Sequence, residues 1–172
     1  MPQTTNNSLT RFKNAFASLL ISRPLSTITV QDIVRKAGVN RSTFYRHFLD
    51  LDDFLDWLEE EMLVEITTHF QLSENKNIDF TQFYQYTNEN RILLQGFLET
   101  NRWNHFIDRL QTIVLKNYLK LLSTQATTIP IEIQVQFFIG GHINLFKWWL
   151  DQENPPTPEK MATYHQKLSQ PR

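Results

Sequence analysis

The sequence predicts an all-α fold of about nine helices, divided into a small N-terminal domain and a larger C-terminal one. First, apolar residues recur three and four positions apart along nearly every segment, and no segment shows the alternation of a strand. Second, residues 28–48 have the pattern of two short helices around a glycine turn. Third, 172 residues with 41% hydrophobic content suffice to bury a real core. We place the domains at residues 1–49 and 50–172.

Two helices are predicted before the glycine turn. The first begins near Asn7 or Ser8 and ends before Pro24. In the second, Thr29 can cap the N-terminus while Asp32, three residues later, bonds back to the N–H of the cap. Gly38 then permits the left-handed backbone that ends this helix. The apolar face of the first helix consists of Leu9, Phe12, Phe16, Leu19 and Leu20.

The third predicted helix presents two different faces. Asn40 can cap it, and Phe44 and Phe48, four residues apart, share an apolar face. Helix-turn-helix proteins present such a helix to the major groove of DNA, held across the preceding helix by a short turn. A hairpin that serves only packing would not explain so polar a surface. The rest of this helix is rich in hydrogen-bond donors, namely Arg41, Ser42, Thr43, Tyr45, Arg46 and His47.

Charge is unevenly distributed, although the formal net charge is only −1. Residues 1–48 contain seven Lys or Arg and a single acidic residue, whereas residues 49–65 contain eight acidic residues and no Lys or Arg. A basic N-terminal domain attracts phosphates at long range. We interpret the acidic stretch as a solvated helix face, and Asp52, Asp53 and Asp56 also complement the dipole of that helix.

Six further helices are predicted in the C-terminal domain. Asp50 caps the first, and the last begins at Thr157 and Pro158 and reaches about Leu168. Between them lie helices over 79–88, 90–100, 103–122 and 131–150, with a polar loop at 73–77 and a turn at 123–130. The buried stripe of the helix after Asp50 consists of Leu51, Phe54, Leu55, Leu58, Met62, Ile66 and Phe70.

The helix over 131–150 is apolar on more than one side, so it must be covered on both. One cover is the core of its own domain, and we assign the other to a second subunit. Gly140 and Gly141 each cost roughly 1 kcal/mol relative to alanine, which a close approach by a neighbouring helix would rationalise. The candidate residues of this dimer interface are Phe138, Gly141, Leu145 and Trp148.

Catalytic and metal-binding patterns are absent from the sequence. There is no cysteine, which excludes disulfides, thiolate catalysis and cysteine-based zinc sites. Glu65 and His69 form one i, i+4 pair, too little for a metal site, so a helical enzyme that uses them is the least favoured alternative. No nucleophile elbow or phosphate-binding glycine loop occurs. We therefore predict no catalytic residue, no metal, no cofactor and no enzyme activity.

We also expect no membrane segment. The N-terminus lacks the charged and then apolar pattern of a signal peptide. The most apolar run, residues 137–150, is interrupted by His142, Asn144 and Lys147. The sequence therefore predicts a cytoplasmic protein.

The helix-turn-helix segment resembles a known family. The run from Arg41 to Phe48, after Ala37-Gly38-Val39-Asn40, resembles the N-terminal domain of TetR-family transcriptional regulators over roughly residues 8–60. Residues 49–58 with Trp57, and residues 138–141 and 148–150, are similar to the branch that contains regulators of dihydroxyacetone kinase operons. The resemblance implies a homodimeric regulator, usually a repressor, that reads a near-palindromic operator and is released by a small-molecule effector. The alternative is a regulator or co-activator whose C-terminal domain is controlled by a partner protein.

The resemblance also implies DNA contacts. Ser42, Thr43 and Arg46 are candidates for base edges, since arginine pairs with guanine and the threonine methyl meets that of thymine. The candidates for phosphates are Thr29, Tyr45 and His47, with Arg41 as a further cation.

One position departs from the family. Many relatives carry a lysine at the start of the fourth helix, where this chain has Leu51. Either a phosphate contact is lost, so that affinity depends more on Arg41, Arg46, Arg11 and Lys13 or is weaker, or Leu51 joins the core and the fourth helix sits differently.

The resemblance further implies an effector pocket among aromatic residues of the C-terminal helices. Side chains at this spacing also suit a simple core, so the assignment of each one stays open. The candidates are Trp57, Met62, Phe83, Tyr84, Trp103 and Phe106.

Overall fold

The computed structural model describes residues 3–69, 80–98, 100–122 and 129–169. Within these ranges it contains nine α-helices and one short 3-10 helix, which confirms the all-α prediction. The predicted loop at 73–77, the turn at 123–130 up to residue 128, and Phe70 lie outside the described residues. The helices are α1 (Gln3–Leu20), η1 (Leu25–Thr27), α2 (Val30–Ala37), α3 (Arg41–Tyr45), α4 (Leu51–His69), α5 (Phe80–Glu89), α6 (Arg91–Leu98), α7 (Arg102–Leu122), α8 (Ile131–Asp151) and α9 (Pro158–Ser169).

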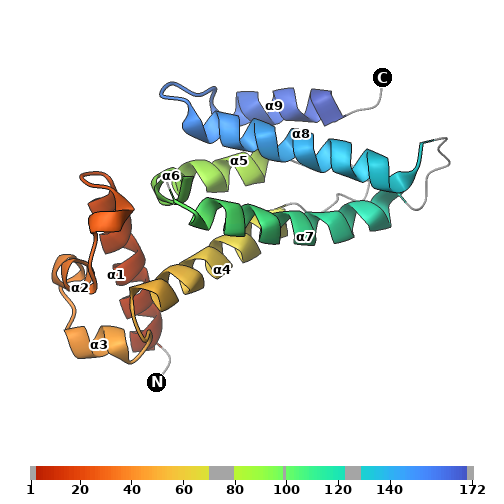
Figure 1. The fold of residues 1–172 in the computed structure, drawn as a ribbon. Helices are drawn as coiled ribbons and strands as arrows, with labels where there is room; N and C mark the ends of the chain where they lie inside the picture. The colour runs from red at the N-terminus through yellow and green to blue at the C-terminus, as the bar shows by residue number, and fades with distance from the viewer. Residues whose placement is uncertain (1–2, 70–79, 99, 123–128, 170–172) are drawn as a thin grey trace.

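The helices form two lobes that share α4 (Figure 1). Helices α1, α2 and α3 make the N-terminal lobe, and α5 to α9 make the C-terminal lobe. Helix α4 begins beside α3 and runs under α7, and it packs against both α5 and α7. Helix α5 packs against α9 and α7 against α8, while α1 also contacts α6 across the two lobes.

An aromatic cluster holds the N-terminal lobe together. Phe44 and Phe48 lie with their ring centroids 5.2 Å apart, and Phe48 lies 5.2 Å from Phe54. Phe54 also contacts Phe16 of α1, at 5.5 Å. Edge-to-face and tilted geometries of this kind are favoured between aromatic rings. Because Phe54 belongs to α4, the first turns of that helix are part of the core of the N-terminal lobe.

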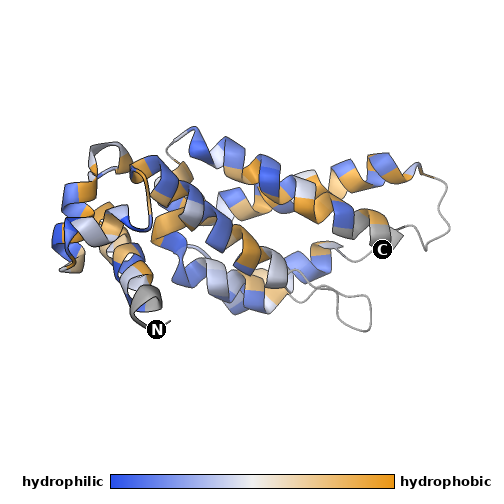
Figure 2. Ribbon diagram, turned by 90° about the horizontal axis from the view of Figure 1, so that it is seen from below, coloured by the Kyte–Doolittle hydropathy of each residue, from blue (hydrophilic) through white to orange (hydrophobic). Residues whose placement is uncertain are grey.

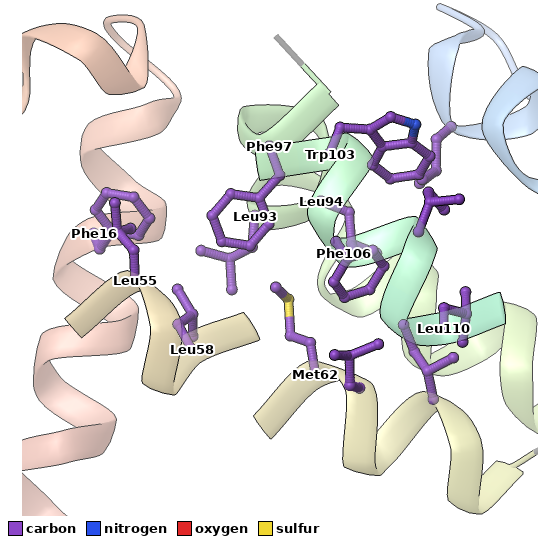
Figure 3. Close-up of a cluster of buried hydrophobic side chains, with 14 of the residues drawn as sticks. Phe16, Leu55, Leu58, Met62, Leu93, Leu94, Phe97, Trp103, Phe106 and Leu110 are labelled. Atoms are coloured by element: carbon purple, nitrogen blue, oxygen red, sulfur yellow. The ribbon is translucent and has the colours of Figure 1, made fainter. Parts of the chain in front are cut away.

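The core continues into the C-terminal lobe along α4. Figure 3 shows Met62 of α4 facing Phe106 of α7, with residues of α6 beside them. Hydrophobic and hydrophilic residues follow one another along the helices, as expected for amphipathic elements that bury one side (Figure 2). The labelled side chains of this cluster are Phe16, Leu55, Leu58, Met62, Leu93, Leu94, Phe97, Trp103, Phe106 and Leu110, all of them buried.

Arg91 fastens α6 to the C-terminal end of α8. Its Nη2 donates to the carbonyl oxygens of Trp149, Leu150 and Gln152 at 3.0, 2.7 and 2.8 Å. Its guanidinium also lies 4.9 Å from the centroid of the Trp149 ring. The last carbonyls of a helix lack partners within the helix, so a cation placed there stabilises its end.

Two predicted boundaries were wrong. Helix α1 begins at Gln3 rather than at Asn7 or Ser8. The prediction started too late because the polar residues before Asn7 add nothing to the apolar stripe from which the helix was predicted. Helix α3 ends at Tyr45, earlier than its apolar spacing suggested. Beyond Tyr45 the N–H of His47 donates to Phe44 O at 2.9 Å, the tighter 3-10 pattern common at helix ends.

Candidate nucleic-acid interface

Helix α2 starts with the predicted capping box. The N–H of Asp32 donates to Thr29 Oγ1 at 3.3 Å, and the N–H of Thr29 donates to Asp32 Oδ2 at 3.1 Å. The Thr29 hydroxyl also donates to the same carboxylate at 2.6 Å, and this bond is the largest of the contacts that lower the pKa of Asp32. Arg23 and Arg35 lie 2.8 and 2.9 Å from this carboxylate. Thr29 is exposed at the start of α2, and its hydroxyl is already hydrogen-bonded to Asp32.

The turn between α2 and α3 also has the predicted geometry. Gly38 has φ 61° and ψ 38°, the left-handed conformation that glycine adopts most easily. Arg11 of α1 braces the turn, since its Nη2 donates to Ala37 O at 2.6 Å and Gly38 O at 3.0 Å. Lys13 lies 3.8 Å from Glu61 of α4. These two cations, expected to support phosphate binding, therefore make internal contacts here.

Helix α3 is anchored on one side and exposed on the other. Asn40 Oδ1 accepts from the N–H of Ser42 at 3.1 Å, which confirms the predicted cap. Phe44 is completely buried, whereas Arg41, Ser42, Tyr45 and Arg46 are exposed and Thr43 is half-buried. A rigid helix with an outward polar face is what direct reading of base edges requires.

The two arginines of α3 are held along its exposed face. Arg41 Nη2 donates to the Tyr45 hydroxyl at 3.0 Å, and its guanidinium lies 5.3 Å from the centroid of the Tyr45 ring. Arg46 Nη2 donates to Thr43 Oγ1 at 3.3 Å. Such contacts between residues three and four apart cost little to exchange for contacts with a ligand.

His47 differs from the other candidates for DNA contact. Its Nε2 lies 3.0 Å from the hydroxyl oxygen of Ser8 in α1, and its ring packs against Phe12 and Phe48. The side chain is half-buried. Through this nitrogen His47 links the segment after α3 to α1.

Leu51 packs against the core, as one of the two interpretations expects. Its side chain is half-buried against the hydrophobic cluster. The helix it begins is capped by acidic residues: Asp50 Oδ1 accepts from the N–H of Asp53 at 2.9 Å, and Asp53 Oδ2 accepts from the N–H of Leu49 at 2.7 Å. The start of α4 therefore presents carboxylates next to α3.

The predicted pocket residues lie mostly in the packed core. Met62, Phe83, Tyr84, Trp103 and Phe106 are each at most 5% exposed. Trp103 and Phe106 stack at 5.9 Å, and Phe83 and Tyr84 lie 4.9 Å apart, so these rings occupy the space between the helices. Trp57 instead lines a groove of about 460 Å³ beside α4, whose other lining residues are Lys13, Glu60, Glu61, Val64, Glu65 and Tyr86.

The predicted dimer residues of α8 differ in their exposure. Gly141 and Trp148 are exposed, whereas Phe138 and Leu145 are half-buried against the core of their own chain. A Cβ added at Gly140 or Gly141 would meet no atom within 4 Å. Ile133 and Phe137 are 60% and 77% exposed and share the face of Gly141 and Trp148. Neither Ile133 nor Phe137 was among the predicted interface residues, although they lie eight and four positions before Gly141.

A buried polar chain, which local sequence patterns do not reveal, crosses the C-terminal lobe. The Tyr84 hydroxyl of α5 lies 2.9 Å from Nδ1 of His165 in α9, whose Nε2 is hydrogen-bonded to Nδ1 of His142 in α8. Burial lowers the pKa of His142 to about 4. Burial, together with the neighbouring His142, lowers the pKa of His165 to about 3. Both histidines are therefore neutral at physiological pH and link three helices.

The described residues offer neither a metal site nor a membrane-spanning helix. They contain no group of three or more His, Cys, Asp or Glu that could hold a metal ion. None of the helices described is long and apolar enough to cross a membrane.

Two family models match the chain. The model of bacterial regulatory proteins of the tetR family matches residues 14–56. The model of a transcriptional regulator C-terminal region from the same family matches residues 74–171, more than half of the chain. The protein belongs to the TetR family of transcriptional regulators. Regulators of this family bind DNA, so the helix-turn-helix prediction and the prediction that the protein is not an enzyme are confirmed.

Curated relatives include two bacterial regulators. The chain is 44% identical over 50 residues to the HTH-type transcriptional regulator YwcC of Bacillus subtilis, covering 29% of this chain and 22% of that protein. It is 32% identical over 93 residues to the dhaKLM operon transcriptional activator DhaS of Lactococcus lactis, covering 54% of this chain and 50% of that protein. The matches thus span half or less of the length of these relatives.

Solved structures match over nearly the whole chain. A TetR transcriptional regulator from Streptococcus agalactiae has a TM-score of 0.66 at 25% identity, with 96% of this chain and 95% of that chain covered. The dihydroxyacetone kinase operon activator DhaS has a TM-score of 0.74 at 18% identity, with 94% and 93% covered. At that identity the second match shows a shared fold.

Proposed function

We propose that the protein is a homodimer that binds a near-palindromic DNA operator and represses transcription until a small molecule releases it. The observation that carries this proposal is the division of α3 into a completely buried Phe44 and an exposed row of polar side chains. Such a protein acts in the cytoplasm, where the DNA is. The proposed DNA contacts are Thr29, Arg41, Ser42, Thr43, Tyr45, Arg46 and His47.

The chemistry of these side chains supports base contacts for some of them and phosphate contacts for the others. Arg46 can pair with the O6 and N7 acceptors of guanine once it exchanges its bond to Thr43, and the freed Thr43 can contact a neighbouring base. Arg41 and Tyr45 extend the donor surface toward the phosphates. His47 has one ring nitrogen bonded to Ser8, so we assign a phosphate to its other nitrogen.

The exposed face of α8 supports the homodimer. Ile133, Phe137, Gly141 and Trp148 follow one another along it, with open space above Gly141. Because glycine has no Cβ, the same helix of a second copy can pack closely against this row of apolar side chains. Phe138 and Leu145 would then border the interface. In the dimer, two α3 helices would enter successive major grooves about 34–36 Å apart.

Release by an effector requires two arrangements of the dimer, only one of which fits the operator. A ligand shifts the equilibrium between these two arrangements only as far as its affinities for them differ. Five of the candidate pocket residues are packed in the core and would have to move apart to admit a ligand. Trp57, in contrast, already lines an open groove. We therefore expect ligand binding to rearrange Met62, Phe83, Tyr84, Trp103 and Phe106.

A second candidate is control by a partner protein. The relative from Lactococcus lactis is named as an operon activator, and five of the six candidate pocket residues are buried in the core. Under this alternative a protein that covers the C-terminal lobe would replace the small molecule. Titration of the operator complex distinguishes the two candidate functions. A repressor should release DNA when a small molecule binds, whereas a regulator controlled by a partner protein should change its DNA affinity only when that protein is added.

The decisive experiment is selection of binding sites from a random DNA library, followed by affinity measurement. We expect a palindromic site, and a loss of about 5- to 150-fold in affinity for Arg46→Ala. Lys160→Ala is the matched control, because it removes an exposed positive charge from α9 and leaves α3 intact. Selection of no sequence, or equal affinities for the two variants, would contradict the proposal.

A further inference from the structure

One arginine of α7 holds three carboxylates of α4. Arg102 Nη2 lies 2.7 Å from Asp52 Oδ1. Arg102 Nη1 lies 2.8 Å from both Asp56 Oδ1 and Glu59 Oε1. The three acidic residues are four and three positions apart, so they form one row along α4. We call these four residues the Arg102 clamp.

The clamp has a buried end and an exposed end. The Glu59 side chain is 0% exposed and the Arg102 side chain 20%, whereas Asp52 and Asp56 remain 82% and 65% exposed. A buried carboxylate needs its partner, because an uncompensated charge in the interior is strongly destabilising. Glu59 therefore fixes the position of Arg102, and the two exposed aspartates bind the first turns of α4 to the same guanidinium.

The same turns of α4 belong to the DNA-reading lobe. Phe54, which lies between Asp52 and Asp56 in the sequence, contacts Phe44 of α3 at 5.8 Å and Phe48 at 5.2 Å. A rotation of these turns relative to α7 would therefore move α3 with them. The clamp connects the start of α7, in the C-terminal lobe, to the part of α4 that supports α3.

We infer that Arg102 is a positioning residue that sets the angle between α4 and α7 and, in the dimer, the separation of the two α3 helices. The inference rests on the proposed function, since the separation matters only in a dimer that reads two half-sites. One base pair of spacer changes the distance between half-sites by about 3.4 Å. A clamp that holds α4 in one position would therefore favour one spacer length.

The absence of cysteine allows a direct test of this inference. Ser26→Cys introduces a single thiol on the exposed surface of η1, and a spin label there reports the distance between the two copies of the dimer. The test variant is the double substitution Asp52→Asn and Asp56→Asn, which removes the exposed charges and leaves Glu59 paired with Arg102. Asp50→Asn is the matched control: it removes one charge from the same helix end, and its amide oxygen still caps α4.

We expect one narrow distance distribution for the labelled protein and for the control, and a broader one for the double variant. Arg102→Lys should lie between them, because an ammonium group can pair with Glu59 but lacks the fork that reaches three carboxylates. Operators with one or two base pairs added to or removed from the spacer give the second measurement. In the double variant, the ratio of affinities for the best spacer and for the altered spacers should fall by about two- to ten-fold, as expected for the loss of two exposed ion pairs. Unfolding midpoints within the range of the control would show that stability is not the cause.

The results separate this inference from the proposed function. A dimer that selects DNA, with distance distribution and spacer preference unchanged in the double variant, would overturn the role of Arg102 alone. A labelled protein that gives no distance between copies and selects no DNA would overturn the proposed function, and the inference with it.

Discussion

The side chain of Leu20 in α1 rests directly on Gly96 in α6. A Cβ added at residue 96 would lie 2.9 Å from Leu20 Cδ1 and 3.0 Å from Leu20 Cδ2, closer than van der Waals contact allows. Glycine at this position therefore lets the N-terminal lobe approach the C-terminal lobe. A groove of about 520 Å³ lies beside the contact, lined by Leu20 and the segment that follows α1, by residues of α6 and by Asp151.

Gly96→Ala should have opposite effects in two backgrounds. In the natural sequence, overpacking against Leu20 should outweigh the gain in helix propensity, for a net loss of up to about 2 kcal/mol. In a Leu20→Ala background, the same substitution should stabilise the protein by about 1 kcal/mol, because the obstacle is gone. Urea unfolding of the four proteins measures both effects. The same sign in both backgrounds would show that the Leu20 contact does not limit residue 96.

Leu51→Lys should strengthen DNA binding. The substitution places a cation next to α3, so we expect the slope of log affinity against log salt to steepen by about 0.9. Because Leu51 is half-buried, a loss of stability should accompany the gain. Affinity titrations between low and high salt give the slope, and Leu51→Ala shows how much of the change comes from lost packing. A slope equal to that of the natural protein would mean that residue 51 does not reach the phosphates.

Gly141→Asp should dissociate the dimer. It adds a charge to an apolar face of α8 where the single chain has open space, so the monomer itself should fold normally. Sedimentation velocity should show a monomer, and affinity for the operator should fall to that of a half-site. Thr112→Asp on the exposed side of α7 is the control and should remain dimeric. We expect Phe138→Asp to dissociate the dimer as well, with some loss of core packing. An intact Gly141→Asp dimer would remove α8 from the interface.

Acid should destabilise the protein through His142 and His165. Their pKa values are lowered to about 4 and about 3 in the folded state, against 6.5 for a free side chain. The unfolded chain therefore binds more protons below pH 6.5, and stability falls as pH drops from that value toward 4. Between pH 7 and 5.5 each histidine should contribute a loss of about 1 kcal/mol.

Unfolding measured across this pH range tests the effect of the histidine pair. His142→Gln with His165→Gln should flatten the dependence, because it removes the two groups whose pKa burial lowers. Equal pH dependence in the natural protein and the double variant would assign the acid sensitivity to other groups.

Local sequence signals predicted the N-terminal lobe well. The Thr29–Asp32 capping box, the left-handed Gly38 and the Asn40 cap all depend on residues within four positions of one another. Such signals have the same meaning in any fold. The end of α3 at Tyr45 could not be predicted in this way, since Phe48 keeps the apolar spacing and its N–H still donates to Phe44 O, although the regular helix has already ended.

Contacts between distant segments could not be read from the sequence. The pairing of Arg102 with Glu59, the bond of His47 to Ser8 and the histidine pair join residues far apart in the chain. The period of a helix shows which side is buried but not which helix covers it. Aromatic residues at helical spacing likewise did not distinguish Trp57, beside a groove, from Phe106, in the core.

The ring contacts of Phe48 with Phe54 and Trp57, at 5.2 and 5.4 Å, bear on how the DNA-reading part could be exchanged between regulators. A segment cut at residue 49 would carry Phe44 and Phe48 into its new host without the rings that cover them. A working chimera should instead take α4 through Trp57 from the same parent as α3. Asp52 and Asp56 then travel with the graft, and the host must supply the arginine that receives them.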